Sequence, residues 1–442
     1  MKIISIKKRK GNFRVMNIST KKNNNYYANG VLVHNCFAYF FKTNNPAIKK
    51  VELKAVDPDS LIYTILGKGK GSGRLFHEHF FKKRFVLHWG GLADPFCSFE
   101  QENGVGLRII KALGKLKYPT LFSFKGSTIF HPAYVKQFEA CSDNHNFAFQ
   151  ISMVTGSDKV GREIEVGVPA PSVRLKAIKM LSDMGHWTIL RLRPFIIGIT
   201  DDGLDDLLER ALAAGIRGIS VEFMAIDGRA NTGMKARYEY ISELIGVDNL
   251  IKHFSELSPR ERGGYMRLNR LVKEPYIKKI YTFCQEHDLV CGVSDPDYKE
   301  LNTSGSCCAM PNEFPKNPEM TNWSKNQMTF VLKEARLLWH TKGIKRRIRF
   351  MDVYPEGISY LDDPRLANDH VRVIGMCNAD RKALTLRVIL QECWNNLNSP
   401  ANPRNYFHGK IMPMGLDSDG NLEYEYNPME YESRWKAEGI IL

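Results

Sequence analysis

The sequence predicts an α/β fold, a partial TIM-type (β/α)6 barrel, which follows a short all-β segment and precedes a less regular C-terminal region. After residue 36, apolar runs of strand length alternate with amphipathic helical stretches, which is the pattern of βα units and a parallel sheet. Before that point, short stretches alternate apolar and polar residues, as half-buried strands do. We therefore expect three parts, residues 1–35, 36–260 and 261–442.

Six apolar runs are the expected barrel strands, and amphipathic helices lie between them. The strands are residues 84–89, 120–124, 147–153, 187–192, 216–223 and 289–293. The helices are residues 107–113, residues 134–140, one capped by Ser172 and ended by Gly185, one from Leu204 to Gly215, and residues 274–287. In such barrels the chemistry takes place on loops at the carboxyl ends of the strands, so residues there are the candidates for function.

Composition limits the class of protein. With 442 residues, 43% of them hydrophobic, the chain is long enough for two or three domains. No apolar run reaches the length of a membrane span, and residues 1–10 are too charged for a signal peptide, so we expect a cytoplasmic protein. Its nine cysteines are accordingly expected as thiols or metal ligands and not as disulfides. The formal charge of +15 favours a polyanionic partner or substrate.

Residues 34–36, His-Asn-Cys, contain the three groups that protein splicing needs at one junction. The Asn35 side-chain amide can attack its own peptide carbonyl and cut the chain after it, while His34 donates a proton to the leaving amine. Before that cleavage, Cys36 is the nucleophile that receives the upstream segment as a thioester. The alternative interpretation is a polar, Asn-rich arm before an ordinary domain.

The residues before this junction resemble the C-terminal end of an intein. Residues 24–30, NNYYANG, resemble the HNYYANG run that precedes intein C-termini, with Asn29-Gly30 as a tight hairpin turn. Residues 15–18 stand where inteins carry VYDI, with Asn17 in place of Asp, and Asn24 replaces the usual His. The resemblance implies that residues 1–35 are the C-terminal half of a split intein of the all-β HINT fold, and that a separate chain carries the N-terminal half.

Residues 36–39, Cys-Phe-Ala-Tyr, resemble the end of the Cys-x3-Cys-x2-Cys motif of radical S-adenosylmethionine enzymes. In that family three thiolates hold a [4Fe–4S] cluster, whose remaining iron binds the amino and carboxylate groups of S-adenosylmethionine. The complete triplet does not occur in this sequence. The resemblance implies that Cys36 becomes the third cluster ligand after splicing and that Phe37 and Tyr39 lie by the cofactor. It also implies that the partner chain supplies the first two cysteines.

Four further segments resemble, in the same order, segments of spore photoproduct lyase-like members of that family. They are residues 85–96 (FVLHWGGLADPF), 122–127 (FSFKGS), 165–174 (EVGVPAPSVR) and 193–201 (RPFIIGITD). The resemblance implies cofactor contacts from Gly90, Gly91, Asp94, Lys125, Ser152 and Arg193. The alternative for Lys125 is an exposed strand-end lysine, and Glu222 stays open between a site residue and a loop contact.

The family's chemistry is reductive cleavage of S-adenosylmethionine to a 5′-deoxyadenosyl radical, which abstracts hydrogen from a substrate, with electrons from a flavodoxin- or ferredoxin-type protein. The lyase resemblance implies DNA repair, with which the basic charge agrees. Gly90-Gly91 stand where the lyase has a hydrogen-donating cysteine, so the substrate stays open between a nucleic acid and a peptide or small molecule. The rival hypothesis is a non-catalytic, basic nucleic-acid-binding adaptor without a cluster. The basic residues of 342–349 are either its nucleic-acid site or a solvated face.

Two groups of side chains remain. Cys291 ends an apolar run, and Cys307 and Cys308 lie in an irregular loop. These three are expected either to hold an auxiliary iron–sulfur cluster or metal, or to be ordinary thiols. His77 and His79 have alternate spacing, for which a solvated loop is expected.

Overall fold

The structure is a computed structural model. It describes residues 26–28, 31–33, 57–90, 94–165, 167–227, 232–257, 265–295, 298, 301–304, 307–311, 347–365, 385–399, 402–406 and 411–426.

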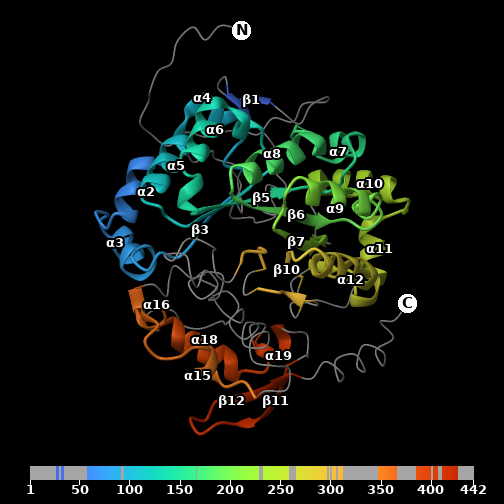
Figure 1. The fold of residues 1–442 in the computed structure, drawn as a ribbon. Coiled ribbons are helices and arrows are strands. Elements are labelled where there is room, and N and C mark those ends of the chain that lie inside the picture. The colour runs from blue at the N-terminus through green and yellow to red at the C-terminus, as the bar shows by residue number, and fades with distance from the viewer. Residues whose placement is uncertain are drawn as a thin grey trace.

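The centre of the fold is a six-stranded parallel sheet whose strands follow one another in chain order (Figure 1). The strands are β3 (Leu87–Trp89), β4 (Thr120–Phe124), β5 (Phe147–Ser152), β6 (Trp187–Phe195), β7 (Gly218–Phe223) and β10 (Val290–Val293). Every neighbouring pair is parallel. This confirms the predicted α/β fold with a sheet of partial TIM type. Since β10 pairs with β7, the sheet continues past the boundary expected at residue 260.

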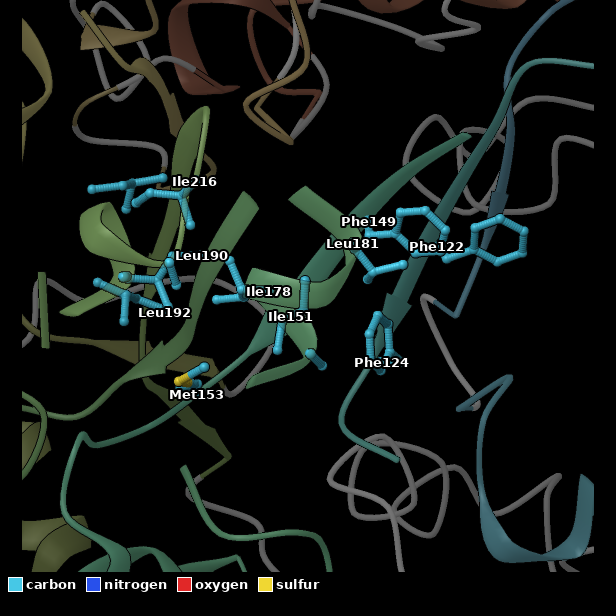
Figure 2. Close-up of a cluster of buried hydrophobic side chains, with 14 of the residues drawn as sticks. Phe122, Phe124, Phe149, Ile151, Met153, Ile178, Leu181, Leu190, Leu192 and Ile216 are labelled. Atoms are coloured by element: carbon cyan, nitrogen blue, oxygen red, sulfur yellow. The ribbon is translucent and has the colours of Figure 1, made fainter. Parts of the chain in front are cut away.

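One face of this sheet is covered by helices. Phe122, Phe149, Leu190 and Leu192 point to that side and form one core with helix residues such as Ile178 (Figure 2). The rings of Phe122 and Phe149 stack at 5.2 Å between centroids. The helices of this layer are α5 (Val105–Lys115), α6 (Pro132–Glu139), α8 (Pro171–Asp183), α9 (Leu204–Ala213) and α12 (Arg270–Glu286).

Helix α8 begins differently from the expectation. Its N-cap is Ala170, and Pro171 occupies the first turn, where a missing N–H costs nothing. Ser172 instead donates its backbone N–H and its hydroxyl to Asp158, at 2.8 and 2.6 Å. The predicted helix end is confirmed, because Gly185 follows the helix with φ +85°, a conformation that suits glycine.

The other face of the sheet is covered by a late segment, residues 307–310. Its side chains pack with Leu121, Ala148 and Ile189, which alternate with the helix-facing residues. Gln150 donates to the Cys308 carbonyl at 2.8 Å, and Ser220 donates to the Cys307 carbonyl at 3.0 Å. Both faces of the parallel sheet are therefore buried, as this kind of sheet requires.

Smaller elements surround the barrel. Upstream lie α2 (Pro58–Ile65), α3 (Ser72–Phe76), the π-helix η1 (His77–Phe81) and α4 (Ser98–Asn103). Further along are η2 (Thr128–Phe130), η3 (Ser142–Asn144), α7 (Asp158–Ile164), α10 (Thr232–Ile245) and α11 (Leu250–Leu257). These last two helices lie in the chain between β8 (Ala225–Asp227) and β9 (Tyr265–Arg267), which pair antiparallel. Among the residues described, no helix is both long and apolar enough to cross a membrane.

The N-terminal segment contains the predicted hairpin. Strand β1 (Tyr26–Ala28) pairs antiparallel with β2 (Val31–Val33), so two residues, Asn29 and Gly30, connect them. Ala28 pairs with Val31, which is the register of a two-residue turn. The rest of the expected intein half, including His34 and Asn35, lies outside the described residues.

A second core joins the π-helix to the C-terminal region. Trp394 is fully buried, donates to the Leu422 carbonyl at 2.6 Å, and packs with Phe80 in one apolar cluster. The C-terminal elements are α15 (Phe350–Val353), α16 (Ser359–Asp362), α18 (Leu386–Asn395), α19 (Pro403–Tyr406), β11 (Ile411–Leu416) and β12 (Leu422–Tyr426). In α18, Cys393 is disulfide-bonded, which corrects the expectation of thiols for this cysteine.

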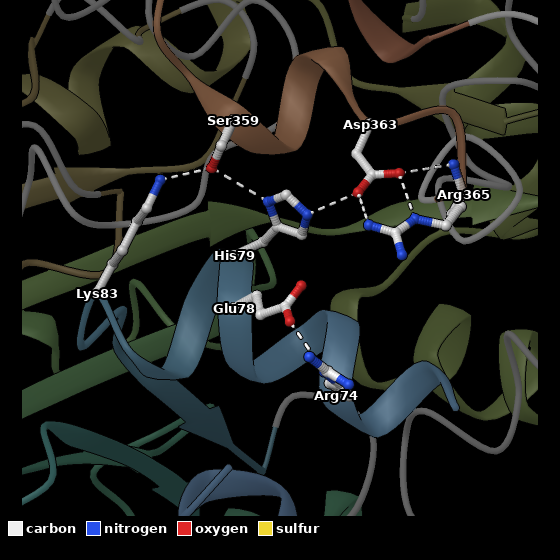
Figure 3. A network of polar contacts seen from close by, with 7 residues as sticks. All are labelled: Arg74, Glu78, His79, Lys83, Ser359, Asp363 and Arg365. Carbon is white, nitrogen blue, oxygen red and sulfur yellow. Dashed lines mark hydrogen bonds and ion pairs between the residues drawn. The ribbon is translucent and has the colours of Figure 1, made fainter. Parts of the chain in front are cut away.

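His79 corrects the expectation of a solvated loop. It lies on η1 with 8% of its surface exposed, because Phe80 beside it enters the second core. Its Nε2 lies 2.9 Å from Asp363 Oδ2 and its Nδ1 lies 3.1 Å from Ser359 Oγ, which also accepts from Lys83 at 2.6 Å (Figure 3). Hydrogen bonds from Arg365 and His79 hold the pKa of Asp363 well below its usual range. This network ties η1 to α16.

Replacing His79 by Ala should loosen the C-terminal core. It removes two hydrogen bonds, one of them to a carboxylate, which predicts a loss of about 1–3 kcal/mol of local stability. Amide hydrogen exchange of α18 should therefore become faster. The matched control is Arg74→Ala, which breaks only the exposed pair with Glu78 on the same segment and should leave exchange in α18 unchanged. Equal exchange in both variants would contradict the assignment.

Candidate active site at the carboxyl ends of the strands

The predicted cofactor-binding residues that the structure describes lie at one edge of the sheet. Gly90 follows β3, Lys125 follows β4, Ser152 ends β5, and Arg193 lies near the end of β6. Because the strands are parallel, their carboxyl ends meet at this edge. His34, Asn35, Cys36, Phe37, Tyr39 and Gly91 lie outside the described residues.

Gly90 is required by packing between two strands. Its φ is +111°, and a Cβ there would lie 1.9 Å from the Ser123 carbonyl oxygen. A side chain at this position would therefore collide with the backbone of β4, and only glycine fits. The structure thus gives Gly90 a role in holding β3 against β4.

Asp94 organises the loop that follows β3. Its carboxylate accepts from the backbone N–H groups of Phe96, Lys125 and Gly126, at 2.8, 2.7 and 2.8 Å. Burial raises the pKa of Asp94, while these hydrogen bonds oppose the rise. Its oxygens therefore connect the β3 loop to the end of β4, which is a different role from the cofactor contact that the resemblance implies.

Lys125 is bound to a buried carboxylate. Its Nζ lies 2.5 Å from Glu165 Oε1, and Arg174 binds the other oxygen of Glu165. Burial alone would raise the pKa of Glu165, but the Lys125 and Arg174 cations lower it to about 2. Glu165 and Arg174 are the two ends of the predicted segment 165–174. The structure brings these ends together beside Ser152, whose carbonyl accepts from Arg174 at 2.5 Å.

Two arginines on β6 extend this polar region. Arg191 donates to Ser152 Oγ at 3.0 Å. Arg193 donates to the hydroxyl of Ser294 and, at 2.7 Å, to the carbonyl of Cys307; its guanidinium lies 3.6 Å from the Glu222 carboxylate. Glu222, which the sequence left open, is thus a partner of a site residue. Arg191 was not predicted, although the two-residue period of β6 places it on the same face as Arg193.

A chain of polar groups runs across three strands, from the exposed His88 to the buried Ser123 and Gln150. His88 Nε2 lies 2.8 Å from Ser123 Oγ, and Ser123 donates to Gln150 Oε1 at 2.5 Å. Since the Ser123 hydroxyl donates to Gln150, it accepts from His88, which places a proton on Nε2. Local sequence holds no signal for this chain, because its three members come from three separate strands.

The three cysteines of the expected auxiliary site lie on opposite faces of the sheet. Cys291 is buried with Cys284 on the helix side, and the hydrogen bond to Cys291 raises the pKa of Cys284. Cys307 and Cys308 lie on the other face. Within the described part of the chain, no group of three or more His, Cys, Asp or Glu side chains could hold a metal ion. The predicted core position of Cys284 is confirmed.

The basic residues of 342–349 are described only in part. Arg347 and Arg349 both bind Glu423, at 3.0 and 2.6 Å, and both arginines are more than half exposed. Glu423 is buried, so these two arginines neutralise a carboxylate of the C-terminal unit. Residues 342–346 lie outside the described residues.

Comparisons with known proteins give faint likenesses. No protein-family model matches the chain, and no curated protein matches it. A crystal structure of Streptococcus suis SuiB aligns with a TM-score of 0.29 and 13% identity over 48% of this chain and 39% of that chain. A structure of Streptococcus suis SuiB bound to S-adenosylmethionine gives a TM-score of 0.32 and 11% identity over 56% and 44%. The chain thus spans about two-fifths of the length of these proteins.

Replacing Glu165 by Gln should destabilise the fold in a pH-dependent way. A folded-state pKa near 2 against the ordinary 4.5 corresponds to about 3 kcal/mol. Because the pKa is lowered on folding, this contribution is present above about pH 4.5 and is lost as the pH falls through 2. Parent and variant should therefore differ at pH 7 and converge in acid, as measured by urea unfolding at several pH values.

The matched control for this prediction is Glu163→Gln, two residues away and exposed, which should stay within about 0.5 kcal/mol of the parent. A difference between the parent and the Glu165→Gln protein that does not change with pH would contradict the role of the Glu165 charge.

Proposed function

We propose that this chain is a trans-splicing precursor whose product is a radical S-adenosylmethionine enzyme. The observation that carries the enzyme part is the meeting of the predicted strand-end residues at one edge of a parallel, partial barrel. Lys125, Ser152 and Arg193 come from three different strands. Glu165 and Arg174 connect Lys125 to Ser152, and Arg191, two residues before Arg193 on β6, donates to Ser152. A parallel barrel with chemistry at this edge is the arrangement in which catalytic residues of such folds are found.

The described residues fit a cofactor with an amino acid group. The cations at the strand ends can hold a carboxylate, and the partly exposed Glu222 carboxylate can accept from an amino group. When bound with its cluster, S-adenosylmethionine would supply a carbon radical able to abstract hydrogen. The chain's own residues would bind and orient it, while residues 307–310 cover the face of the sheet that points away from the helices.

The splicing part rests on the junction of residues 34–36 and on the hairpin before it. Strand β2 ends at Val33, and His34 follows Val33 in the sequence. Cyclisation needs the Asn35 side-chain amide to lie against its own peptide carbonyl. Cys36 would serve first as splicing nucleophile and then as a cluster ligand.

Mixing the chain with a partner that carries an N-terminal intein half and a Cys-x3-Cys-x2 ending should remove residues 1–35 and join the partner to Cys36. Mass spectrometry of the products measures this. Asn35→Ala should block release and accumulate a branched intermediate, because cyclisation needs the side-chain amide. Asn23→Ala, an asparagine outside residues 24–30, is the matched control and should splice. An unspliced chain under all partners and reductants would contradict the proposal.

Cys36→Ser should separate the two roles of this residue. A serine hydroxyl can still act as a splicing nucleophile, but it does not replace a thiolate as an iron ligand. The variant should therefore yield some ligated product with much less iron and sulfide than the parent product. Iron and sulfide analysis also separates the enzyme from a basic nucleic-acid-binding adaptor. Parent product without iron after anaerobic reconstitution would favour the adaptor.

A further inference from the structure

Two arginines of β6 lie on the face of the sheet that points away from the helices. Leu190 and Leu192 belong to the helix-side core, so Arg191 and Arg193, which alternate with them, point to the inside of the barrel. Both guanidinium groups are largely buried. Burial, and then repulsion by the neighbouring Arg193 cation, lower the pKa of Arg191 to about 10.

The carboxylates at this edge of the sheet are already bound. Glu165 binds Lys125 and Arg174, and Asp94 accepts from three backbone N–H groups. Glu222 is 3.6 Å from Arg193, and its side chain is 41% exposed, which makes this a weak pair. Among the described residues, Arg191 has no carboxylate within ion-pair distance, and its hydrogen bond goes to the neutral hydroxyl of Ser152.

Three arginines here also have an unused donor. The Nε atoms of Arg174, Arg191 and Arg193 are buried and make no hydrogen bond within the described part of the chain. A buried N–H without an acceptor is costly, and native proteins keep few of them without a reason. The guanidinium fork binds carboxylate and phosphate groups with two parallel hydrogen bonds, and Nε is commonly one of the donors.

We propose that Arg191 and Arg193 form a binding site for an oxyanion of the substrate, a phosphate or a carboxylate group. The anion would supply the negative charge that Arg191 does not find among the described residues, would add to the weak pair of Arg193 with Glu222, and would accept from the buried donors. The assignment of this anion to the substrate rests on the proposed function, whereas the oxyanion site itself does not. The cost of burying Arg191 would be offset only when the anion is bound.

Thermal unfolding of the full, unspliced chain tests the site. Inorganic phosphate should raise Tm above that in chloride of equal ionic strength, because a ligand that binds only the folded state stabilises it. In Arg191→Met and Arg193→Met, the phosphate affinity taken from the rise should fall about tenfold or more, the change expected when a charge-assisted hydrogen bond is lost. The control Arg108→Met, at an exposed pair with Asp59, should respond like the parent.

The direction in which Arg191→Met changes Tm in chloride, without phosphate, separates a binding role of Arg191 from a structural one. A buried cation without a carboxylate partner costs stability, so Arg191→Met should unfold at the same temperature as the parent or higher in chloride. Arg191→Lys keeps the charge without the fork and should give a weaker phosphate response. A lower Tm of Arg191→Met in chloride, or a parent that does not respond to phosphate, would overturn the proposal.

Further arms identify the source of the anion. In one arm acetate replaces phosphate, and the anion that raises Tm more shows whether the site prefers a carboxylate or a phosphate group. In the spliced product, saturating S-adenosylmethionine should leave phosphate binding unchanged. Competition between the two would assign the arginines to the cofactor's own carboxylate and overturn the assignment to the substrate. A failure of splicing would leave the phosphate result on the intact chain standing, so the two proposals fail separately.

Discussion

The whole arrangement depends on burying both faces of one parallel sheet. Such a sheet has no face that can stay in water, and its strands alternate between the two faces. On β6, Leu190 and Leu192 face the helices, while Ile189 faces residues 307–310. The chain therefore has to return to its own barrel more than a hundred residues after β6, and backbone carbonyls of that segment accept from Gln150, Arg193 and Ser220. Because both faces of the sheet are covered, polar chemistry is left to the carboxyl ends of the strands.

At these ends the charge is arranged unevenly. Glu165 lies between two cations, which hold its pKa far below the usual value. It therefore stays ionised and keeps Lys125 and Arg174 in place. Two residues along β6 from Arg193, Arg191 has only a hydroxyl partner among the described residues. A network in which every cation has a carboxylate partner would serve stability alone. A buried cation without such a partner, as Arg191 is among the described residues, is instead expected where a ligand binds.

The strands could be predicted from sequence because each is an apolar run whose position depends on local composition. The strand predicted at residues 120–124 has the same bounds as β4, and the run at 289–293 is β10 within one residue. Long-range contacts could not be predicted in this way. His79 resembles a surface residue until Asp363, 284 positions later, is placed beside it. The backbone contacts of Asp94 and Gly90 with the end of β4 likewise have no signal in the local sequence, whereas their cofactor contacts remain a prediction. The junction of residues 34–36 remains a prediction from sequence.

The central claim is that Cys36 belongs to a cluster motif which only splicing completes. The most direct measurement is 5′-deoxyadenosine formed from S-adenosylmethionine and dithionite, after iron and sulfide have been reconstituted separately into the unspliced chain and into the ligated product. One thiolate cannot hold a cluster that needs three, so the account predicts 5′-deoxyadenosine from the ligated product alone. Equal formation by the unspliced chain would contradict it.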